Sequence, residues 1–350
     1  MRFLLIGAGV IGHVHARLIT SLGAQADLVC IADTDLPKAV ALATEYGAAA
    51  TDDVTAALAR EDIDAVSVCV PSGGHADIAV AALQAGKHVV IEKPLEVTLE
   101  AADRILAAER ASGRTVAVIS QRRFQQAPAY VHRAISEGKL GRITSGIAES
   151  TFWRSQEYYD SGGWRGTRAL DGGGALMNQG IHVLDLLIWM LGEPVEVQAV
   201  SECLAHERID VEDTLSATIR FANGAVGTIT ATTAAYPGLP VRLSVHGDRG
   251  SAVIEREELA YFHSADPDSG GGAGADTDPP QNQAPASDGP QGQASIDDAH
   301  RDQYLDFIAA VRDGRPPLVG TREGRRALHT VLAIYESART RKPVTLNGAP

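Results

Sequence analysis

The chain has 350 residues, of which 45% are hydrophobic and 21% charged, a composition typical of a globular protein with one large or two ordinary domains. Lys and Arg number 31 against 44 Asp and Glu, so the formal net charge is −13 at pH 7. Such acidity repels polyanions, and we expect neither nucleic acid nor an anionic membrane as a partner. The three cysteines lie far apart and indicate neither a disulfide framework nor a metal site, which fits a reducing cytoplasm.

The first third of the chain alternates short apolar runs with alanine-rich amphipathic stretches. Buried parallel strands joined by helices give this pattern, so it predicts a doubly wound α/β sheet over residues 1–121, a Rossmann domain. The expected strands are 2–6, 28–32, 65–70, 88–91 and 115–120, and the expected helices include 36–46, 75–85 and 99–111.

Residues 122–350 have a different pattern, which predicts a second domain of the α+β class. Apolar and polar residues alternate with period two between 213 and 256, with an Asn223-Gly224 turn, as in an open and mainly antiparallel sheet. Helical patterns return at 303–312 and 322–341. The longest uncharged run, 221–241, contains three glycines and two prolines, so we expect no membrane helix.

Residues 264–296 are compositionally distinct from the rest of the second domain. They contain six glycines, five prolines and five aspartates but no lysine, arginine or aromatic residue. Such a segment cannot bury enough apolar surface to offset its ordering, so we expect a flexible acidic loop. Both a functional lid and an inert insertion fit this composition.

A nucleotide-binding fingerprint follows the first predicted strand. Gly7-Ala8-Gly9-Val10-Ile11-Gly12 fits GxGxxG, and Asp33 lies 21 residues beyond Gly12 at the end of the next strand. The glycines permit close approach to a pyrophosphate at a helix N-terminus, and the carboxylate accepts hydrogen bonds from a ribose. Because Asp33 repels a 2′-phosphate and Thr34, not arginine, follows it, NAD is favoured over NADP.

His13 and His15 lie two residues apart on the helix that follows the fingerprint. Residues at this spacing point to different sides of a helix, so we expect packing or capping roles and no metal site.

A lysine ends one of the buried strands. Glu92-Lys93-Pro94 follows the apolar run 88–91, at the carboxyl edge where open α/β sheets bind ligands. Proline disfavours a helical conformation for Lys93 and so holds the lysine at a non-helical corner.

A glycine-rich segment forms the second polar cluster. Three glycines at 172–174 precede a helical run that places Asn178, His182 and Asp185 on one face, at spacings of four and three. We expect a functional His182, while structural and supporting roles both remain open for Asp185.

Together these residues resemble the Gfo/Idh/MocA family of NAD(P)-dependent oxidoreductases, named for glucose–fructose oxidoreductase and inositol dehydrogenase. The resemblance covers the chain outside 264–296. Its marks are Gly7–Gly12, Val70-Pro71-Ser72 with His75, Glu92-Lys93-Pro94, Gln121-Arg122-Arg123-Phe124, Trp164-Arg165, and 172–182 with Asp185.

The resemblance implies roles for individual residues. By this resemblance Lys93 and His182 are the expected catalytic pair, and Asn178 is the third expected catalytic residue. The expected substrate contacts are these three residues with Arg123 and Arg165. The expected cofactor contacts are Gly7, Gly9, Val10, Ile11, Gly12, Asp33, Thr34, Val70, Pro71, Ser72, His75, Glu92, Lys93, Gln121, Trp164 and Arg165.

Asn178 departs from one branch of the family. Inositol dehydrogenase-like members carry aspartate there, so an Asp–His pair does not transfer to this chain. The wording of residues 176–182 is closer to members that act at C3 of sugars, glycosides or nucleotide-linked amino-sugar acids.

Oxidation of a secondary alcohol needs a base for the hydroxyl proton and a donor that bonds the reacting oxygen. We expect His182 to take the proton and Lys93 to bond the oxygen, in an NAD-dependent dehydrogenase acting on a sugar, glycoside or polyol. The alternatives are a nucleotide-sugar 3-dehydrogenase, an inositol dehydrogenase, a glycosidase that oxidises C3 transiently, and a sensor without catalysis. The family also implies a homodimer or homotetramer formed through the C-terminal sheet.

Overall fold

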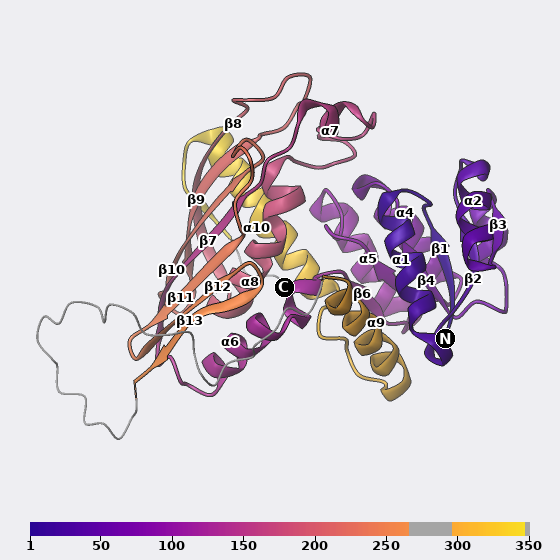
Figure 1. Cartoon of the computed structure of the whole chain (residues 1–350), viewed down its shortest axis with the longest axis horizontal. Coiled ribbons are helices and arrows are strands. Elements are labelled where there is room, and N and C mark those ends of the chain that lie inside the picture. The colour runs from indigo at the N-terminus through magenta and orange to yellow at the C-terminus, as the bar shows by residue number, and fades with distance from the viewer. Residues whose placement is uncertain (266–295, 347–350) are drawn as a thin grey trace, which may run out of the picture.

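A computed structural model of the chain describes residues 1–265 and 296–346. It contains two sheets, each in its own layer with helices, and the two lie side by side (Figure 1). The predicted loop lies outside the described residues from 266 to 295, between Ser264, which ends the last long strand, and Ile296, which begins a helix.

The first sheet is parallel throughout, as predicted, with strand order β3-β2-β1-β4-β5-β6. Its strands are β1 Arg2–Ile6, β2 Asp27–Ala32, β3 Ala49–Thr51, β4 Ala65–Val68, β5 His88–Ile91 and β6 Val116–Val118. Its helices are α1 Val10–Ser21, α2 Leu36–Tyr46, α3 Val54–Leu58, α4 His75–Gln84 and α5 Leu99–Ser112, with short helical turns η1 Gly23–Gln25, η2 Ser72–Gly74 and η3 Gln121–Phe124.

Local signals explain where these elements begin and end. The side chain of Asp35 accepts a hydrogen bond from the Lys38 amide at the start of α2, and Gly47 ends that helix with a φ of 70°. The structure shortens the predicted strands that begin near Ala65 and Thr115. It also adds β3, whose three residues form no apolar run that sequence patterning can detect.

The second sheet has the strand order β13-β12-β11-β7-β10-β9-β8-β14 and is antiparallel except where β7 pairs with β10. Its strands are β7 Ile143–Thr151, β8 Pro194–Glu202, β9 Thr214–Phe221, β10 Val226–Thr232, β11 Arg242–Gly247, β12 Gly250–Glu255, β13 Glu258–Ser264 and β14 Val344–Thr345. The associated helices are α6 Gln126–Ser136, α7 Gln156–Asp160, the π-helical turn η4 Leu176–Gly180, α8 Ile181–Leu191 and α10 Thr321–Thr340.

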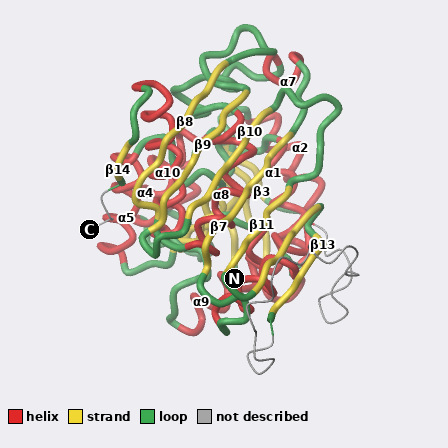
Figure 2. Tube along the Cα trace, turned by 90° about the vertical axis from the view of Figure 1, so that its left-hand side faces the viewer, coloured by secondary structure: helices red, strands yellow, loops and turns green. Residues whose placement is uncertain are grey.

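The alternating pattern of this sheet separates a buried face from an outer face. Leu215, Ile219 and Phe221 of β9 are each 1% exposed, whereas Ser216 and Thr218 on the opposite face are exposed. Helices α8 and α10 lie on the side of the sheet that faces the first domain (Figure 1). Figure 2 views the sheet from its other side, where strands β7 to β11 lie at the front.

Helix α9, Ile296–Asp313, returns to the first domain although it follows the second sheet in the chain. Its Tyr304 and Phe307 are buried and contact Phe3 of β1. Their ring centroids lie 5.7 and 6.3 Å, respectively, from that of Phe3. Gln303 donates to the carbonyl of Val118 at the end of β6. The core of the first domain is therefore completed by a late segment of the chain.

No helix in the two described ranges is both long and apolar enough to cross a membrane.

Candidate active site

The glycine turn between β1 and α1 has the geometry that the fingerprint predicts. Gly7 adopts a φ of 104°, and a Cβ on Gly12 would lie 2.0 Å from the carbonyl oxygen of Gly7. A Cβ on Gly9 would instead meet nothing within 4 Å. Gly7 and Gly12 are thus required by the turn itself, while Gly9 faces open space beside the N-terminus of α1.

Asp33 closes the other side of this turn. One oxygen of its half-buried carboxylate accepts a hydrogen bond from the Ala8 amide at 2.7 Å, and the other accepts from the Asp35 amide at 2.8 Å. Thr34 beside it is exposed. The carboxylate is therefore fixed next to the glycine turn, where a ribose hydroxyl can donate to it.

A second observation fits a dinucleotide at this edge of the sheet. Gln121 follows β6 and is 7% exposed, yet its side-chain oxygen has no hydrogen-bond partner within the described part of the chain. An unsatisfied buried acceptor is costly unless a ligand donates to it. The open space at Gly9, the fixed carboxylate of Asp33 and the Gln121 oxygen suit NAD.

Two of the expected cofactor contacts, His75 and Glu92, form hydrogen bonds within the protein. His75 is 1% exposed, and its ring nitrogens lie 2.8 and 3.0 Å from the carbonyl oxygens of Pro94 and Val70. Glu92 is 5% exposed and accepts hydrogen bonds from His15 and from the Lys93 amide, each at 2.9 Å. The polar atoms of both side chains are therefore already hydrogen-bonded within the protein, and their contacts to a cofactor stay predictions.

His15 has the packing role expected of a helical histidine. It is fully buried, and its second ring nitrogen contacts the hydroxyl groups of Ser67 and Tyr304. Burial opposes a charge on its imidazole, but Cys69, Tyr304 and Glu92 outweigh burial and raise the pKa of His15 well above its usual value. His15, Glu92 and the buried His300 hold potential metal-ligand atoms within 4.8 Å of one another, although His15 and Glu92 already bond to each other.

Lys93 reaches from the end of β5 into the second domain. Its side-chain nitrogen donates to both the backbone and the side-chain oxygen of Asn178, at 3.2 Å each. Burial lowers the pKa of Lys93, and Arg154 and Arg165 lower it further, against the opposing effects of Glu92 and Asp171. The ammonium group is thus held in place with its charge partly disfavoured.

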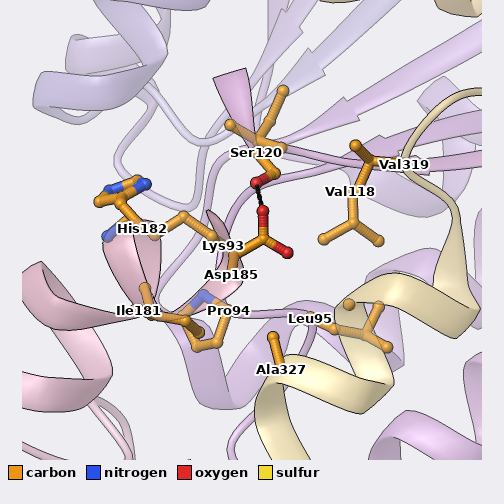
Figure 3. A pocket seen from close by; sticks show the side chains of 12 residues that line it. Lys93, Pro94, Leu95, Val118, Ser120, Ile181, His182, Asp185, Val319 and Ala327 are labelled. Carbon is orange, nitrogen blue, oxygen red and sulfur yellow. Dashed lines mark hydrogen bonds between the residues drawn. The ribbon is translucent and has the colours of Figure 1, made fainter. Parts of the chain in front are cut away.

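His182 lies one helical turn after Asn178, at the start of α8, and Figure 3 shows it beside Lys93. Burial lowers the pKa of His182 well below 6.5, and the charges of Lys93 and Arg122 act in the same direction. At neutral pH the imidazole is therefore uncharged and can accept a proton.

A cavity of about 20 Å³, large enough for about one water molecule, is lined in part by Lys93 and His182. Ser120 and Asp185 provide its polar wall, and their hydrogen bond is the dashed line in Figure 3. The remaining lining residues of this cavity are mainly apolar.

Asp185 is bonded to two other side chains, and this arrangement is compatible with both of the roles left open for it. Its buried carboxylate accepts from Ser120 and from two guanidinium nitrogens of Arg123, at 2.6 and 2.7 Å. Arg123 is 4% exposed and also lies over the ring of Trp189. The predicted substrate contact of Arg123 stays a prediction; in the structure its guanidinium joins η3 to α8.

Arg165 and Arg154 both lie over the ring of one tyrosine. Their guanidinium carbons are 4.4 and 4.8 Å from the ring centroid of Tyr158, and Arg165 also lies over Trp164. The Tyr158 hydroxyl accepts from Gln179, the residue after Asn178. Within residues 1–265 and 296–346 neither guanidinium has a carboxylate partner, and the Nε of Arg154 is buried without a hydrogen bond.

Sequence reasoning missed two buried carboxylates. Asp171 is 3% exposed and accepts from the Asn178 side chain, and Glu212 is 8% exposed and accepts from the amides of Gly174 and Leu176. The position of Asp171, immediately before three glycines, was the available signal for it. Glu212 lies between β8 and β9. No signal in the sequence pointed to it, because only the fold brings it to the backbone of Gly174 and Leu176.

Comparison with known proteins places the chain in a family. Residues 1–120 match "Oxidoreductase family, NAD-binding Rossmann fold" and residues 132–346 match "Oxidoreductase family, C-terminal alpha/beta domain", the two domains of the Gfo/Idh/MocA family. The chain belongs to this family, so it is an oxidoreductase whose N-terminal domain binds NAD.

The relatives differ in what their names say they act on. The chain is 27% identical to inositol 2-dehydrogenase of Rhizobium meliloti, covering 99% of both chains. It is 33% identical to D-glucoside 3-dehydrogenase of Escherichia coli over 65% of this chain and 68% of that one. The crystal structure of the WlbA dehydrogenase from Bordetella pertussis, in complex with NADH and UDP-GlcNAcA, aligns over 99% of both chains with a TM-score of 0.87 and 32% identity.

Proposed function

We propose that this protein is an NAD-dependent dehydrogenase that oxidises a secondary hydroxyl group of a sugar, glycoside or polyol. The observation that carries the proposal is the pairing of a neutral His182 with a fixed Lys93 at the carboxyl edge of the nucleotide-binding sheet. One group of the pair accepts a proton and the other donates a hydrogen bond, as alcohol oxidation requires.

The proposed roles follow from the chemistry of each group. His182 takes the hydroxyl proton, since its imidazole is uncharged at neutral pH. Lys93 donates a hydrogen bond to the reacting oxygen and opposes the negative charge that develops on it. Asn178 orients a neighbouring hydroxyl, and bound NAD supplies the acceptor for the hydride at C4 of its nicotinamide.

A specific observation favours a second candidate, a nucleotide-sugar 3-dehydrogenase. Arg154 and Arg165 lie over Tyr158 without salt-bridge partners in the described chain, and guanidinium groups bind diphosphates and carboxylates well. The WlbA structure was solved with UDP-GlcNAcA, a sugar that carries both groups. Asn178 makes an inositol substrate less favoured, because the inositol branch that the sequence resembles has aspartate there.

The decisive experiment incubates the purified protein with NAD and a panel of inositols, neutral glycosides, uronic acids and nucleotide sugars. We expect NADH to appear in solution, with one equivalent formed per oxidised sugar. Sugar release without net NADH would identify a glycosidase that oxidises C3 transiently. Absence of both, with NAD still bound, would indicate a sensor and overturn the proposal.

We also propose that the second sheet joins two or four copies of the chain. Its outer face carries the exposed apolar residues Ile147, Val200 and Val226, from strands β7, β8 and β10. Analytical ultracentrifugation should find a dimer or tetramer in wild type, and Val226→Arg should shift it toward the monomer. A monomeric wild-type chain would contradict this proposal.

A further inference from the structure

Asp171 is linked to Lys93 through a single side chain. One oxygen of the buried Asp171 carboxylate accepts from the Asn178 amide nitrogen at 2.5 Å, and the other accepts from the Gly166 backbone at 2.8 Å. The carbonyl oxygen of the same Asn178 amide accepts from Lys93. A buried carboxylate thus lies one amide away from the proposed catalytic ammonium group.

The chemistry of the two neighbours fixes the orientation of this amide. An ammonium group only donates hydrogen bonds and an ionised carboxylate only accepts them, so the oxygen must face Lys93 and the nitrogen must face Asp171. An aspartate at position 178 would place a second carboxylate against that of Asp171, which like-charge repulsion disfavours. Asn178 therefore suits this site because Asp171 already supplies the negative charge.

We propose that Asp171 is a positioning residue that acts through Asn178 to hold the Lys93 ammonium group at the reacting oxygen. This inference rests on the proposed function, because the reacting oxygen is that of the proposed sugar or polyol. It adds a residue that neither the nucleotide fingerprint nor the Lys93–His182 pair contains. The loop before the three glycines thereby acquires a part in the reaction.

The charges around the pair give this role a pH signature. Burial raises the pKa of Asp171 to about 6, against the effects of the Gly166 amide, Lys93 and Arg165. Asp171 in turn raises the pKa of Lys93, together with Glu92. Protonation of Asp171 below about pH 6 therefore removes one of the two charges that favour the ammonium form. The remaining charged groups facing Lys93 are Arg154 and Arg165, and those acting on His182 include Arg122 and His300.

The first test exchanges the two partners. Asp171→Asn and Asn178→Asp should each lower kcat by about 10- to 100-fold, as seen when a partner that orients a functional group is removed. The double variant restores one carboxylate and one amide between Gly166 and Lys93, so it should recover most of the lost turnover. Two single losses that simply multiply in the double variant would overturn the proposal.

The pH profile separates positioning from simple structural support. In wild type, kcat should fall on the acid side near pH 6. Asp171→Asn should lose this acid limb, and its alkaline limb should move to lower pH because Lys93 has lost a stabilising charge. Asp171→Ser offers a second, smaller variant with the same expectation if the amide disturbs folding. An unchanged profile in both variants would contradict the inference.

A measurement that needs no turnover keeps this inference separate from the proposed function. Acetic anhydride labelling of Lys93 in the full-length protein, followed by peptide mass spectrometry across a pH series, reports the pKa of its amine. Asp171→Asn should move the labelling midpoint to lower pH. The matched control is Glu212→Gln. Glu212 is a buried carboxylate that accepts hydrogen bonds from the backbone amides of Gly174 and Leu176.

The two proposals fail in different ways. The Glu212→Gln control should lower the midpoint of thermal unfolding without moving the Lys93 labelling curve. An equal shift in both variants, or none in Asp171→Asn, would overturn the role of Asp171. A shift confined to Asp171→Asn in a protein that oxidises no compound of the panel would overturn the proposed function and leave the Asp171–Lys93 linkage supported.

Discussion

The carboxylate of Glu92 lies 2.9 Å from the Nε2 of His15, and its other oxygen accepts from the Lys93 amide at the same distance. His15 belongs to α1, the helix that follows the glycine turn, whereas Glu92 follows β5. This contact therefore ties the element that receives the nucleotide to the backbone of the proposed catalytic lysine. Both side chains are buried, so the pair is screened from solvent.

Removing one partner of this pair should be strongly destabilising. His15→Ala leaves the Glu92 carboxylate buried without its partner, which typically costs about 3–5 kcal/mol in free energy of unfolding. Urea denaturation followed by circular dichroism measures the difference. His13→Ala is the control: His13 is exposed, so the change should stay within about 0.5 kcal/mol. Equal effects of the two substitutions would contradict the importance of the pair.

The same pair should make stability depend on pH in a defined window. The pKa of Glu92 is lowered in the folded protein, so its contribution is present above its unfolded value of about 4.3 and is lost as pH falls. The pKa of His15 is raised, so its contribution is complete below about 6.5 and is lost as pH rises through the folded value. The stability difference between wild type and His15→Ala should therefore be largest between about pH 4.3 and 6.5. A difference that is constant from pH 4 to 9 would show that the pair is uncharged.

The two glycines at 9 and 12 should respond differently to alanine. Gly12→Ala places a methyl group 2.0 Å from the Gly7 carbonyl, so the turn must shift, at a cost of about 1–3 kcal/mol in stability. Gly9→Ala meets nothing within 4 Å and should unfold like wild type. Its methyl group enters the space beside the α1 N-terminus, so the Kd for NAD should rise at least about tenfold. Calorimetric titration and thermal unfolding on both variants check this contrast.

Asp33 should set the preference for NAD over NADP. Asp33→Asn keeps an oxygen that can accept from the Ala8 amide but removes the charge that repels a 2′-phosphate. We expect the ratio of kcat/KM for NADP to that for NAD to rise by about tenfold, equivalent to about 1.4 kcal/mol. Asp35→Asn, which alters a nearby carboxylate in a salt bridge with Lys38, should leave the ratio near its starting value.

His182→Gln should separate chemistry from cofactor binding. Loss of a general base lowers kcat by about 10²- to 10⁴-fold, while the Kd for NAD should stay unchanged because the glycine turn is intact. His132→Gln is the matched control, since His132 stacks on Trp189 with ring centroids 3.9 Å apart and lies outside the site. Near-normal turnover in His182→Gln would remove this residue from the mechanism.

Much of the site could be predicted because its signals are local in sequence. The glycine fingerprint with Asp33 and the spacing of Asn178 and His182 reflect turn and helix geometry, which neighbouring residues determine. The ion pair between Arg123 and Asp185 could not be predicted, because only the packing of η3 on α8 brings the two residues together.

Partners distant in sequence explain the other omissions. Glu212 bonds the backbone at Gly174 from the segment just before β9, and Tyr304 completes the first core from a helix near the end of the chain. No local pattern encodes such contacts. Residues whose polar atoms face inward, as His75 does, also cannot be distinguished in sequence from residues that face a ligand.

Arg154 should report the charge of the substrate. Its guanidinium lies over Tyr158 without a carboxylate partner in the described chain, so an anionic substrate group can bind there without breaking an existing ion pair. Charge-assisted hydrogen bonds contribute about 1.5–3 kcal/mol, so Arg154→Gln should raise KM for a uronic acid or nucleotide sugar by roughly 10- to 150-fold. Arg168→Gln, an exposed arginine bonded to the carbonyl of Asp210, should change KM little and serves as the control. Steady-state kinetics on charged and neutral sugars decides between the two substrate classes. An equal effect of Arg154→Gln on both would place Arg154 outside substrate recognition, whereas a loss confined to charged sugars would favour the nucleotide-sugar candidate over the neutral glycoside.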